Sequence, residues 1–560
     1  MVKFKLRKSK PGIGKARKSI AERISEYFAK RKKKKVEEIL MSIIKKEPIT
    51  VLPIKPTYTI IESYYVYEPF AKVNIVTIPE RGGMLGYYVE EFTLTPEEHE
   101  TLEKLIDILT EELEPTEAIE DLRSYVTKEV IRLANKYRSV FRLTGSRRAK
   151  ILYYVERNLL GYGPIDPLMR DPSIEDISCD GAGKPIYVWH KKYESLPTNI
   201  IFNDTEHLND FIMRLAHMAG KHVSIAFPVL DAMLPEKHRL AATFGTEVSP
   251  RGPTFTIRKF REKPLSPTEL IKSGVIDEIF AAYIWYMVEK RKTFMIAGGT
   301  GAGKTTLLNA FSLFIRPGMK IVTVEDTPEL NLPHENWVQL STRVSYAIIG
   351  QKTSEITLYD LVKISLRYRP DYIIVGEVRG EEAFVLFQAM ATGHGGLSTI
   401  HAETLDYAIK RLMSPPMNIP PAYMKLMNIF MHIQRVVKPK TPTKFKVERR
   451  VTVAQEVADY NDYRMVMRWD PIKDSHELFF KNSVLVKEVA KQSGITVDDV
   501  IEDIHKRAVF LRWLIARNVL DVWEVARYIF KYSFDPYNTY KMAYEDLKSL
   551  GVDVEALIKA

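Results

Sequence analysis

The stretch FMIAGGTGAGKTTLLNAF, residues 294–311, constrains the fold of this chain more than any other feature. Gly298, Gly303, Lys304 and Thr305 fit the pattern G-x-x-x-x-G-K-[ST]. The apolar run before them indicates a strand, and the residues after them indicate a helix. Glycines let backbone N–H groups wrap around a phosphate, and the amino terminus of a helix adds a favourable dipole. The motif therefore predicts an α/β fold that contains a phosphate loop.

The residues of this loop have distinct predicted roles. We expect the Lys304 side chain to reach the β and γ phosphates of a nucleotide, and the Thr305 hydroxyl to bind Mg²⁺. ATP and Mg²⁺ are thus the predicted cofactors. The predicted nucleotide-binding residues of the loop are Gly298, Gly299, Thr300, Gly301, Ala302, Gly303, Lys304, Thr305 and Thr306.

Two short apolar runs that end in acids follow the loop. The stretch RPDYIIVGEVRG (369–380) ends its apolar run just before Glu377, and KIVTVEDTPEL (320–330) ends one at Glu325, with Glu329 one turn further on. Ligands of open α/β sheets bind at the carboxyl ends of the strands. A phosphate-loop enzyme needs a carboxylate there for the Mg²⁺ shell and a residue that orients the attacking water. Both acids are candidates, and a solvated acid at the end of a strand is the alternative for each.

Two histidines follow Glu377 closely in the stretch QAMATGHGGLSTIHAE (388–403). His394 and His401 flank a Gly-Gly pair and a short Ser-Thr-Ile run. This arrangement is consistent with a sensor of the γ-phosphate, and a purely structural histidine is an equally strong alternative.

Composition limits the classes of protein that this chain can belong to. Its 560 residues exceed what one hydrophobic core supports, so about two to four domains are expected. The single cysteine, Cys179, excludes an intramolecular disulfide and a four-cysteine zinc module. No run approaches the roughly 18 apolar residues that span a bilayer, and the amino terminus lacks the apolar core of a signal peptide. We therefore expect a cytoplasmic protein.

The positive charge is concentrated in an amino-terminal tail. Residues 1–35 contain fifteen Lys or Arg and two Glu, an excess of +13, whereas the whole chain carries +11. The remainder thus carries about −2, and it is not a surface that coats nucleic acid. The tail is either a solvated, mostly disordered segment or an anchor to an anionic membrane surface. Nucleic-acid binding is a third, less favoured alternative.

The pattern along the chain predicts four parts. A basic tail occupies residues 1–48, an α+β domain 49–258, a motor domain with its linker 259–459, and a helical subdomain 460–560. Strands are expected within 51–92. A helix is expected from Pro96, because Thr95 can cap it and Glu98 completes a capping box.

The motifs, taken together, resemble those of the secretion-ATPase superfamily, the hexameric motors of type II and type IV secretion and of type IV pili. GGTGAGKTT, VEDTPEL, RPDYIIVGEVRG and ATGHGGLSTIHAE correspond in order and spacing to the Walker A motif, Asp box, Walker B motif and His box of that family. GYGPIDPLMRDPSIEDISCDG, AFPVLDAMLP and GPTFTIRKF resemble its preceding domain. The final hundred residues resemble those of the archaeal branch. The lack of a four-cysteine zinc module fits that branch. The fold that this implies is a RecA-like P-loop motor domain, preceded by an α+β domain and followed by a helical subdomain.

The resemblance also implies roles for individual residues. Glu325 would be the general base or water-orienting acid, and Glu377 would be the Walker B acid that acts on Mg²⁺. His401 would be the box histidine that links the nucleotide state to contacts between subunits. Lys304 would join these three as a catalytic residue.

Arginines are expected to complete the nucleotide site, because in this family the nucleotide lies between two domains. The candidates from the amino-terminal domain are Arg239 and Arg258, and those on the motor side are Arg343 and Arg379. An ion pair at the surface is the alternative for each.

The function implied is a cytoplasmic, Mg²⁺-dependent ATPase at the inner face of the cell membrane. A homohexamer would drive assembly of a type IV pilus-like filament, or secretion, through a polytopic membrane platform protein, with a hinge at 259–267. The alternatives are an archaellum motor, a nucleic-acid translocase that binds phosphates through KRKKKK, and a non-hydrolysing scaffold. The presence of Lys304, Thr305, Glu325 and Glu377 argues against the scaffold, and nucleic acid is the less favoured partner.

Overall fold

In the computed structural model, the described residues form two compact units, and the chain divides between residues 260 and 261. The boundary falls within 259–267, where the sequence predicts a linker. The predicted basic tail, residues 1–48, lies outside the described residues. Those described are 49–112, 128–129, 131–133, 135–137, 145–260, 263–343, 347–348, 351–352, 355–441 and 444–555.

The first unit is built on a ten-stranded sheet in the order β2-β3-β4-β7-β6-β5-β10-β9-β8, with β1 paired to β7. Its strands are β1 (Ile49–Val51), β2 (Thr59–Tyr67), β3 (Ala71–Ile78), β4 (Met84–Glu91), β5 (Ile174–Cys179), β6 (Pro185–His190), β7 (Glu194–Phe202), β8 (Val229–Met233), β9 (Arg239–Thr243) and β10 (Thr254–Arg258). Its α-helices within the described residues are α2 (Pro96–Glu112), α4 (Gly145–Val155), α5 (Asp166–Arg170) and α6 (Thr205–Met218).

The predicted capping box of α2 is confirmed. The backbone N–H of Thr95 donates to Glu98 Oε2 over 2.9 Å, and the N–H of Glu98 donates to Thr95 Oγ1 over 3.3 Å. Each side chain therefore satisfies a backbone donor that the first turn leaves without a partner. Leu102 and Leu105 then form a buried stripe against the rest of the unit.

Strands β2, β3 and β4 confirm the strands expected within 51–92, and they belong to the same sheet as the rest of the unit. β4 pairs with β7 in parallel. Asn199 strengthens this junction, because its side chain accepts from the N–H of Val89 over 2.8 Å and donates to the carbonyl of Val89 over 2.9 Å. The first third of the unit is thus continuous with the remainder.

The second unit is built on a nine-stranded sheet in the order β13-β12-β16-β17-β11-β18-β19-β20-β21, beside a small β14-β15 ribbon. The strands from β13 to β18 in this order pair in parallel, and β18 to β21 pair antiparallel. These strands are β11 (Phe294–Ala297), β12 (Ile321–Glu325), β13 (Trp337–Ser341), β14 (Ala347–Ile348), β15 (Gln351–Lys352), β16 (Tyr372–Val375), β17 (Gly395–Ile400), β18 (Ile429–Thr441), β19 (Lys444–Asp459), β20 (Asp462–Asp470) and β21 (Ser475–Leu478).

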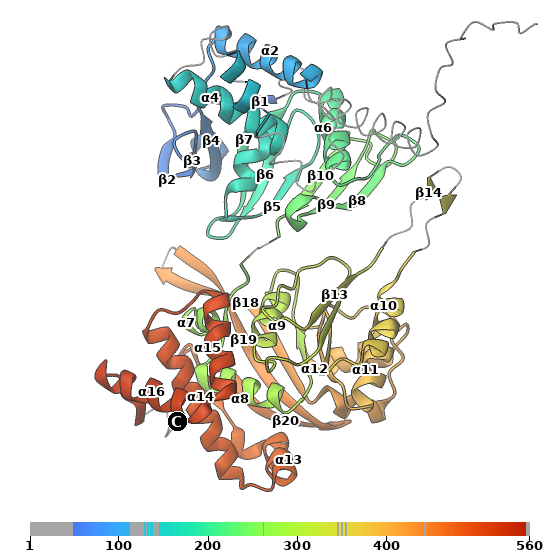
Figure 1. The fold of residues 1–560 in the computed structure, drawn as a ribbon, viewed down its shortest axis with the longest axis vertical. Coiled ribbons are helices and arrows are strands. Elements are labelled where there is room, and N and C mark those ends of the chain that lie inside the picture. The colour runs from blue at the N-terminus through green and yellow to red at the C-terminus, as the bar shows by residue number, and fades with distance from the viewer. Residues whose placement is uncertain are drawn as a thin grey trace, which may run out of the picture. The chain divides into compact units, whose positions relative to one another are not determined.

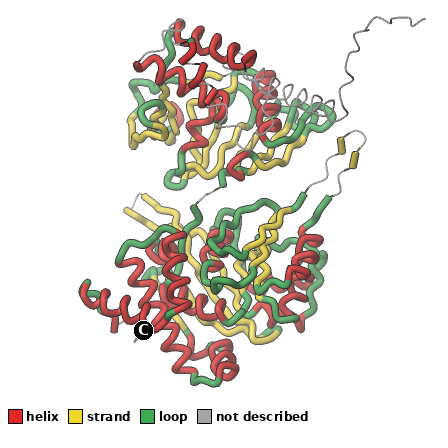
Figure 2. Tube along the Cα trace, viewed as in Figure 1, coloured by secondary structure: helices red, strands yellow, loops and turns green. Residues whose placement is uncertain are grey.

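Helices cover both faces of this sheet, as Figures 1 and 2 show. Alternate residues of a strand face opposite sides, so Phe294 and Ile296 join one hydrophobic core while Met295 and Ala297 join another. The first core contains α7 (Pro267–Lys272), α8 (Glu278–Glu289), α9 (Lys304–Ser312), α13 (Val484–Ser493), α14 (Val497–Ala516), α15 (Val522–Phe534) and α16 (Pro536–Ser549). The second contains α10 (Leu358–Ser365), α11 (Glu382–Ala391) and α12 (Leu405–Met413).

The carboxyl-terminal hundred residues are only partly helical. Residues 462–478 form strands β20 and β21, and the helices begin at Val484. The expectation of helices from residue 460 is therefore corrected: Asn461 takes a left-handed backbone (φ 65°) between β19 and β20, and this turn extends the sheet instead. The helices that follow share one core with the parallel sheet, where Trp285 packs against Phe510 and Tyr532. The expected fold class, a RecA-like domain between an α+β domain and terminal helices, is confirmed.

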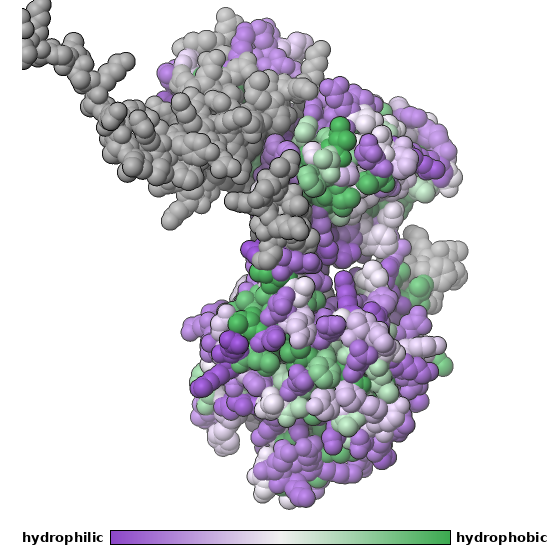
Figure 3. All heavy atoms as spheres, turned by 90° about the vertical axis from the view of Figure 1, so that its right-hand side faces the viewer, coloured by the Kyte–Doolittle hydropathy of each residue, from purple (hydrophilic) through white to green (hydrophobic). Residues whose placement is uncertain are grey.

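No helix among the described residues combines the length and the apolar character that crossing a membrane requires. The 20-residue helix α14 buries Val500, Ile504 and Leu511 but carries acids at Asp498 and Asp499. The face of the second unit that Figure 3 shows mixes hydrophilic and hydrophobic residues.

Candidate nucleotide site

The phosphate loop joins β11 to α9 with the geometry that its glycines allow. Gly301 and Gly303 have φ angles of 69° and 101°, which lie in the left-handed region that favours glycine. A Cβ atom on Gly298 would lie 2.3 Å from the backbone oxygen of Ile433 on β18. Gly301 and Gly303 are therefore needed for their backbone conformation, and Gly298 is needed for its close contact with the neighbouring strand.

Lys304 begins α9 and folds back over this loop. Its Nζ donates to the carbonyls of Gly298 and Gly299 over 3.0 and 3.1 Å. Burial lowers the pKa of Lys304, and the negative charge of Glu377 acts in the opposite direction. The ammonium thus lies at the mouth of the loop, where phosphate oxygens could replace the two carbonyls as acceptors.

Glu377 follows β16 at the carboxyl edge of the parallel sheet. Its Oε2 accepts a hydrogen bond from Nη2 of Arg379 over 2.8 Å. Burial alone would raise the pKa of Glu377, but Arg379, Lys304 and His401 outweigh it and lower the pKa below its ordinary value. Glu377 is therefore an ionised carboxylate, the form that a metal ion requires.

Glu325, at the end of β12, is held inside the protein. Its side chain is 3% exposed, and its Oε1 accepts from the backbone N–H groups of Glu329 and Leu330 over 2.8 and 2.9 Å. Its Oε2 accepts from Nε2 of Gln339 over 3.2 Å. Burial raises the pKa of Glu325 to about 7, although these hydrogen bonds act to lower it. The contacts show that Glu325 shapes the loop that follows its strand.

Glu329 occupies that loop and is exposed. Its negative charge acts to raise the pKa of both Lys304 and Arg379. The two glutamates of the VEDTPEL stretch therefore differ: Glu325 is enclosed by its own loop, and Glu329 is exposed and acts electrostatically on the charged groups of the site.

The two histidines lie at opposite ends of β17. His394 precedes the strand, and its Nδ1 lies 3.1 Å from both Thr392 Oγ1 and the carbonyl of Ala389. His401 follows the strand, at the edge of the sheet that carries Glu377. The length of β17 places it roughly 20 Å from His394. The backbone oxygen of His401 accepts from Arg411 over 2.6 Å. The two histidines are close in the sequence, but only His401 lies at the edge of the sheet that carries Glu377.

The candidate arginines have varied surroundings. Arg379 lies at the site beside Glu377. In the first unit, Arg239 Nη2 lies 3.1 Å from Asp231 Oδ2 and Arg258 Nε lies 3.0 Å from Asp176 Oδ1. That Arg239 and Arg258 contact the nucleotide stays a prediction. The same holds for Arg343, whose backbone pairs with that of Ile356.

Sequence reasoning missed one residue at the loop. Arg449 lies on β19, and its Nε donates to the carbonyl of Gly301 over 3.2 Å. Its Cδ would lie 3.2 Å from a Cβ placed on Gly303. No motif marks this arginine, because 148 positions along the chain separate it from Gly301.

A metal ion at this edge would find oxygen ligands. Thr305, in the first turn of α9, is half-buried, and the carboxylate of Glu377 is ionised. Mg²⁺ prefers hard oxygen donors and keeps only one or two protein ligands beside phosphate oxygens. The residues present therefore fit Mg²⁺ bound together with a nucleotide.

Comparison with known proteins identifies the family. A model of the family described as type II/IV secretion system protein matches residues 158–494. The chain belongs to this family. The match covers the candidate site and part of the first unit.

Similar members occur in archaea and bacteria. An uncharacterized protein of Methanocaldococcus jannaschii is 40% identical over 393 residues, which are 69% of this chain and 70% of that protein. A putative conjugal transfer protein of Mycobacterium tuberculosis is 35% identical over 260 residues, 45% of this chain and 72% of that protein. The crystallised ATPase DotB of Legionella pneumophila is 17% identical, with a TM-score of 0.36 over 67% of this chain and 92% of its own.

Proposed function

We propose that this family member hydrolyses ATP at the loop 298–306 with the help of Mg²⁺. The observation that carries the proposal is the meeting of three features at one edge of a parallel sheet. These are a glycine loop that leads into a helix, a lysine that covers the loop, and an ionised carboxylate just beyond β16, which is two strands away from β11 in the sheet. In phosphate-loop enzymes, the same three features bind and polarise a nucleoside triphosphate.

Each residue has a separate task in this proposal. Lys304 would exchange its two loop carbonyls for oxygens of the β and γ phosphates. Thr305 and Glu377 would hold Mg²⁺, which neutralises charge that develops on the phosphates. Arg379 would keep Glu377 ionised and could add positive charge beside the transferred phosphate.

We infer that Glu329 orients the attacking water, whereas Glu325 keeps the loop in shape. Supporting this are the exposure of Glu329, its electrostatic influence on Lys304 and Arg379, and the enclosure of Glu325 by three donors. The sequence motif assigns the water-orienting role to Glu325 instead, and the turnover of Glu329→Gln and Glu325→Gln distinguishes the two assignments. His401, exposed at the sheet edge, would report the nucleotide state to a neighbouring subunit.

Hydrolysis would drive mechanical work in a homohexamer at the inner face of the cell membrane. Family membership and the conjugal transfer name of one relative support a role in secretion or in assembly of a pilus-like filament through a membrane platform protein. Movement of one unit against the other about residues 259–267 would transmit the work. An archaellum motor has the same site chemistry and is the second candidate.

The test is ATP turnover by the full chain alone, with anionic liposomes, and with single-stranded DNA. A matched variant replaces Lys32, Lys33, Lys34 and Lys35 with glutamine, and Lys304→Ala is the inactive control. If liposomes stimulate turnover of the unmodified chain but not of the glutamine variant, the result supports a motor that docks to the membrane through its tail. Stimulation by DNA that falls steeply with salt would favour the nucleic-acid translocase. Absence of any Lys304-dependent turnover would contradict the proposed activity.

A further inference from the structure

Strand β19 carries two consecutive arginines whose side chains have opposite surroundings. Successive side chains on a strand point to opposite faces. Arg449 is exposed and reaches the carbonyl of Gly301 in the phosphate loop, while Arg450 is 3% exposed. The first arginine therefore contacts the candidate nucleotide site, and the second is built into the protein.

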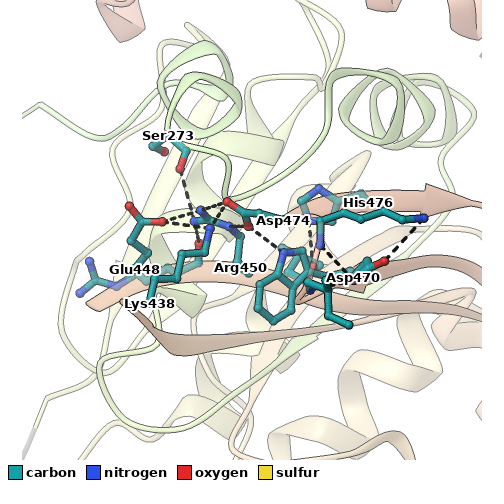
Figure 4. A network of polar contacts seen from close by, with 12 residues as sticks. Ser273, Lys438, Glu448, Arg450, Asp470, Asp474 and His476 are labelled. Carbon is teal, nitrogen blue, oxygen red and sulfur yellow. Dashed lines mark hydrogen bonds and ion pairs between the residues drawn. The ribbon is translucent and has the colours of Figure 1, made fainter. Parts of the chain in front are cut away.

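Arg450 fixes the strand at this point through a dense polar network, shown in Figure 4. Its Nε and Nη2 donate to the two carboxylate oxygens of Asp474 over 2.9 and 3.0 Å. Its Nη1 donates to the carbonyl of Arg449 over 2.8 Å, and it also contacts the carbonyl of Ser273. Arg450 is buried, and its bidentate pair with the exposed Asp474 fixes the orientation of the guanidinium. The network therefore holds the backbone of Arg449 in place beside the loop.

The guanidinium of Arg449 has donors to spare. Within the described residues, the guanidinium makes one hydrogen bond, from Nε to the carbonyl of Gly301, and the side chain is exposed. A guanidinium with open donors suits a phosphate oxygen, because it can form charge-assisted hydrogen bonds.

The strand order shows which end of a bound nucleotide Arg449 would meet. Glu377 follows β16 and Glu325 ends β12, and both strands lie on one side of β11 in the sheet. Arg449 comes from β19, two strands away on the other side of β11. A metal ion and the terminal phosphate belong on the side of the acids. The arginine therefore lies toward the opposite end of the phosphate chain, where the phosphate next to the nucleoside would be.

We propose that Arg449 is a nucleotide-binding residue that contacts the α-phosphate end of a nucleoside di- or triphosphate from within the same subunit. The inference rests on the proposed nucleotide site and adds a residue to it. Because the α-phosphate is not the reacting group, Arg449 would stabilise bound ATP and its transition state equally. Its loss would then raise KM without lowering kcat.

The experiment measures ADP affinity by calorimetry, and KM and kcat for ATP, in the full chain. The test variants are Arg449→Ala and Arg449→Gln. The matched control is Arg464→Gln on β20, which removes an exposed arginine that pairs with Asp462. Thermal unfolding of each variant checks that the fold is intact, and the glutamine variant keeps the test available if the alanine variant does not fold.

We expect both Arg449 variants to bind ADP about tenfold more weakly or worse, the loss of one charge-assisted hydrogen bond. KM for ATP should rise by a similar factor while kcat stays within about twofold. Unchanged ADP affinity in a folded variant would overturn the inference, and so would a fall in kcat at unchanged affinity. If the unmodified chain and Arg464→Gln bind no ADP, the proposed nucleotide site itself fails, which is a separate outcome.

Discussion

Nη2 of Arg379 and Oε2 of Glu377 lie 2.8 Å apart, joined by a hydrogen bond between residues that both follow β16. Arg379 also lies 3.8 Å from Asp326, beyond the end of β12. One arginine thus connects the acid-bearing ends of two neighbouring parallel strands. It also supplies the positive charge that keeps the half-buried Glu377 ionised.

Replacing Arg379 with glutamine should move the acid limb of the pH profile to higher pH. The pKa of Glu377 is lowered, so this carboxylate remains ionised at pH values where an ordinary glutamate is partly protonated. Without the arginine, burial would raise that pKa, and the ionised form would be lost at higher pH. The measurement is kcat/KM for ATP between pH 4.5 and 8, with Arg468→Gln on β20 as the control. An acid limb that does not move would show that Glu377 is not the titrating group.

The two glutamates of the VEDTPEL stretch should respond differently to removal of charge. Glu329→Gln should lower kcat by about 100-fold or more, the usual contribution of a positioned acid or base. ADP affinity should change little, because the water is absent from the ADP complex. Glu325→Gln should have the smaller effect on kcat. The opposite order would restore Glu325 as the water-orienting residue.

The same Glu325 should make stability depend on pH. Its pKa rises from 4.5 to about 7 on folding, so the folded protein favours the protonated form. The stabilisation from this proton is complete below pH 4.5 and is lost as pH rises through 7. The slope is at most about 1.4 kcal/mol per pH unit. Urea unfolding at pH 5, 6, 7 and 8 should show this decline, and Glu325→Gln should show less of it. Equal slopes in the two proteins would contradict the raised pKa.

A buried carboxylate attaches the terminal helices to the sheet. Glu456 on β19 accepts from Tyr283 Oη over 2.6 Å and from the backbone N–H groups of Val484 and Leu485 over 2.6 and 3.1 Å. It is 1% exposed. Glu456→Ala would leave several buried donors without an acceptor, each costing about 1 to 3 kcal/mol.

We therefore expect Glu456→Ala to lower the free energy of unfolding by about 3 kcal/mol or more. The matched control is Glu477→Ala, which removes a partly exposed acid from β21 that pairs with Arg468. Urea denaturation measures both. A loss of less than 1 kcal/mol for Glu456→Ala would show that water or a shifted side chain replaces the carboxylate.

The phosphate loop could be predicted because its signal is local. Glycine spacing, an apolar strand before it and a helix after it all lie within 294–311, and the structure contains each of them. The capping box at Thr95 was predictable for the same reason, since both of its residues lie within the four positions from Thr95 to Glu98. The acids beside the ends of β12 and β16 were predictable because each follows a short apolar run that is typical of a buried strand, and the structure forms both strands.

Local patterns were weaker where strand and helix compete. Residues 462–470 contain alternating polar and apolar residues that suit a strand. Because helical patterns follow closely, the sequence predicts helices over the whole of 460–560. Pairing with β19 decided the outcome, because a strand gains its hydrogen bonds from a neighbour that the local sequence does not reveal.

By itself, the sequence determined where the phosphate loop lies, which acids end the neighbouring strands, and which family the motifs resemble. Only the tertiary structure decided that Glu325 is enclosed while Glu329 is exposed, and that His394 and His401 lie at opposite ends of β17. The tertiary structure also decided that Arg449 contacts Gly301. The physical reason is that strand order and side-chain burial arise from contacts between segments far apart in the chain, and no spacing within a motif encodes them.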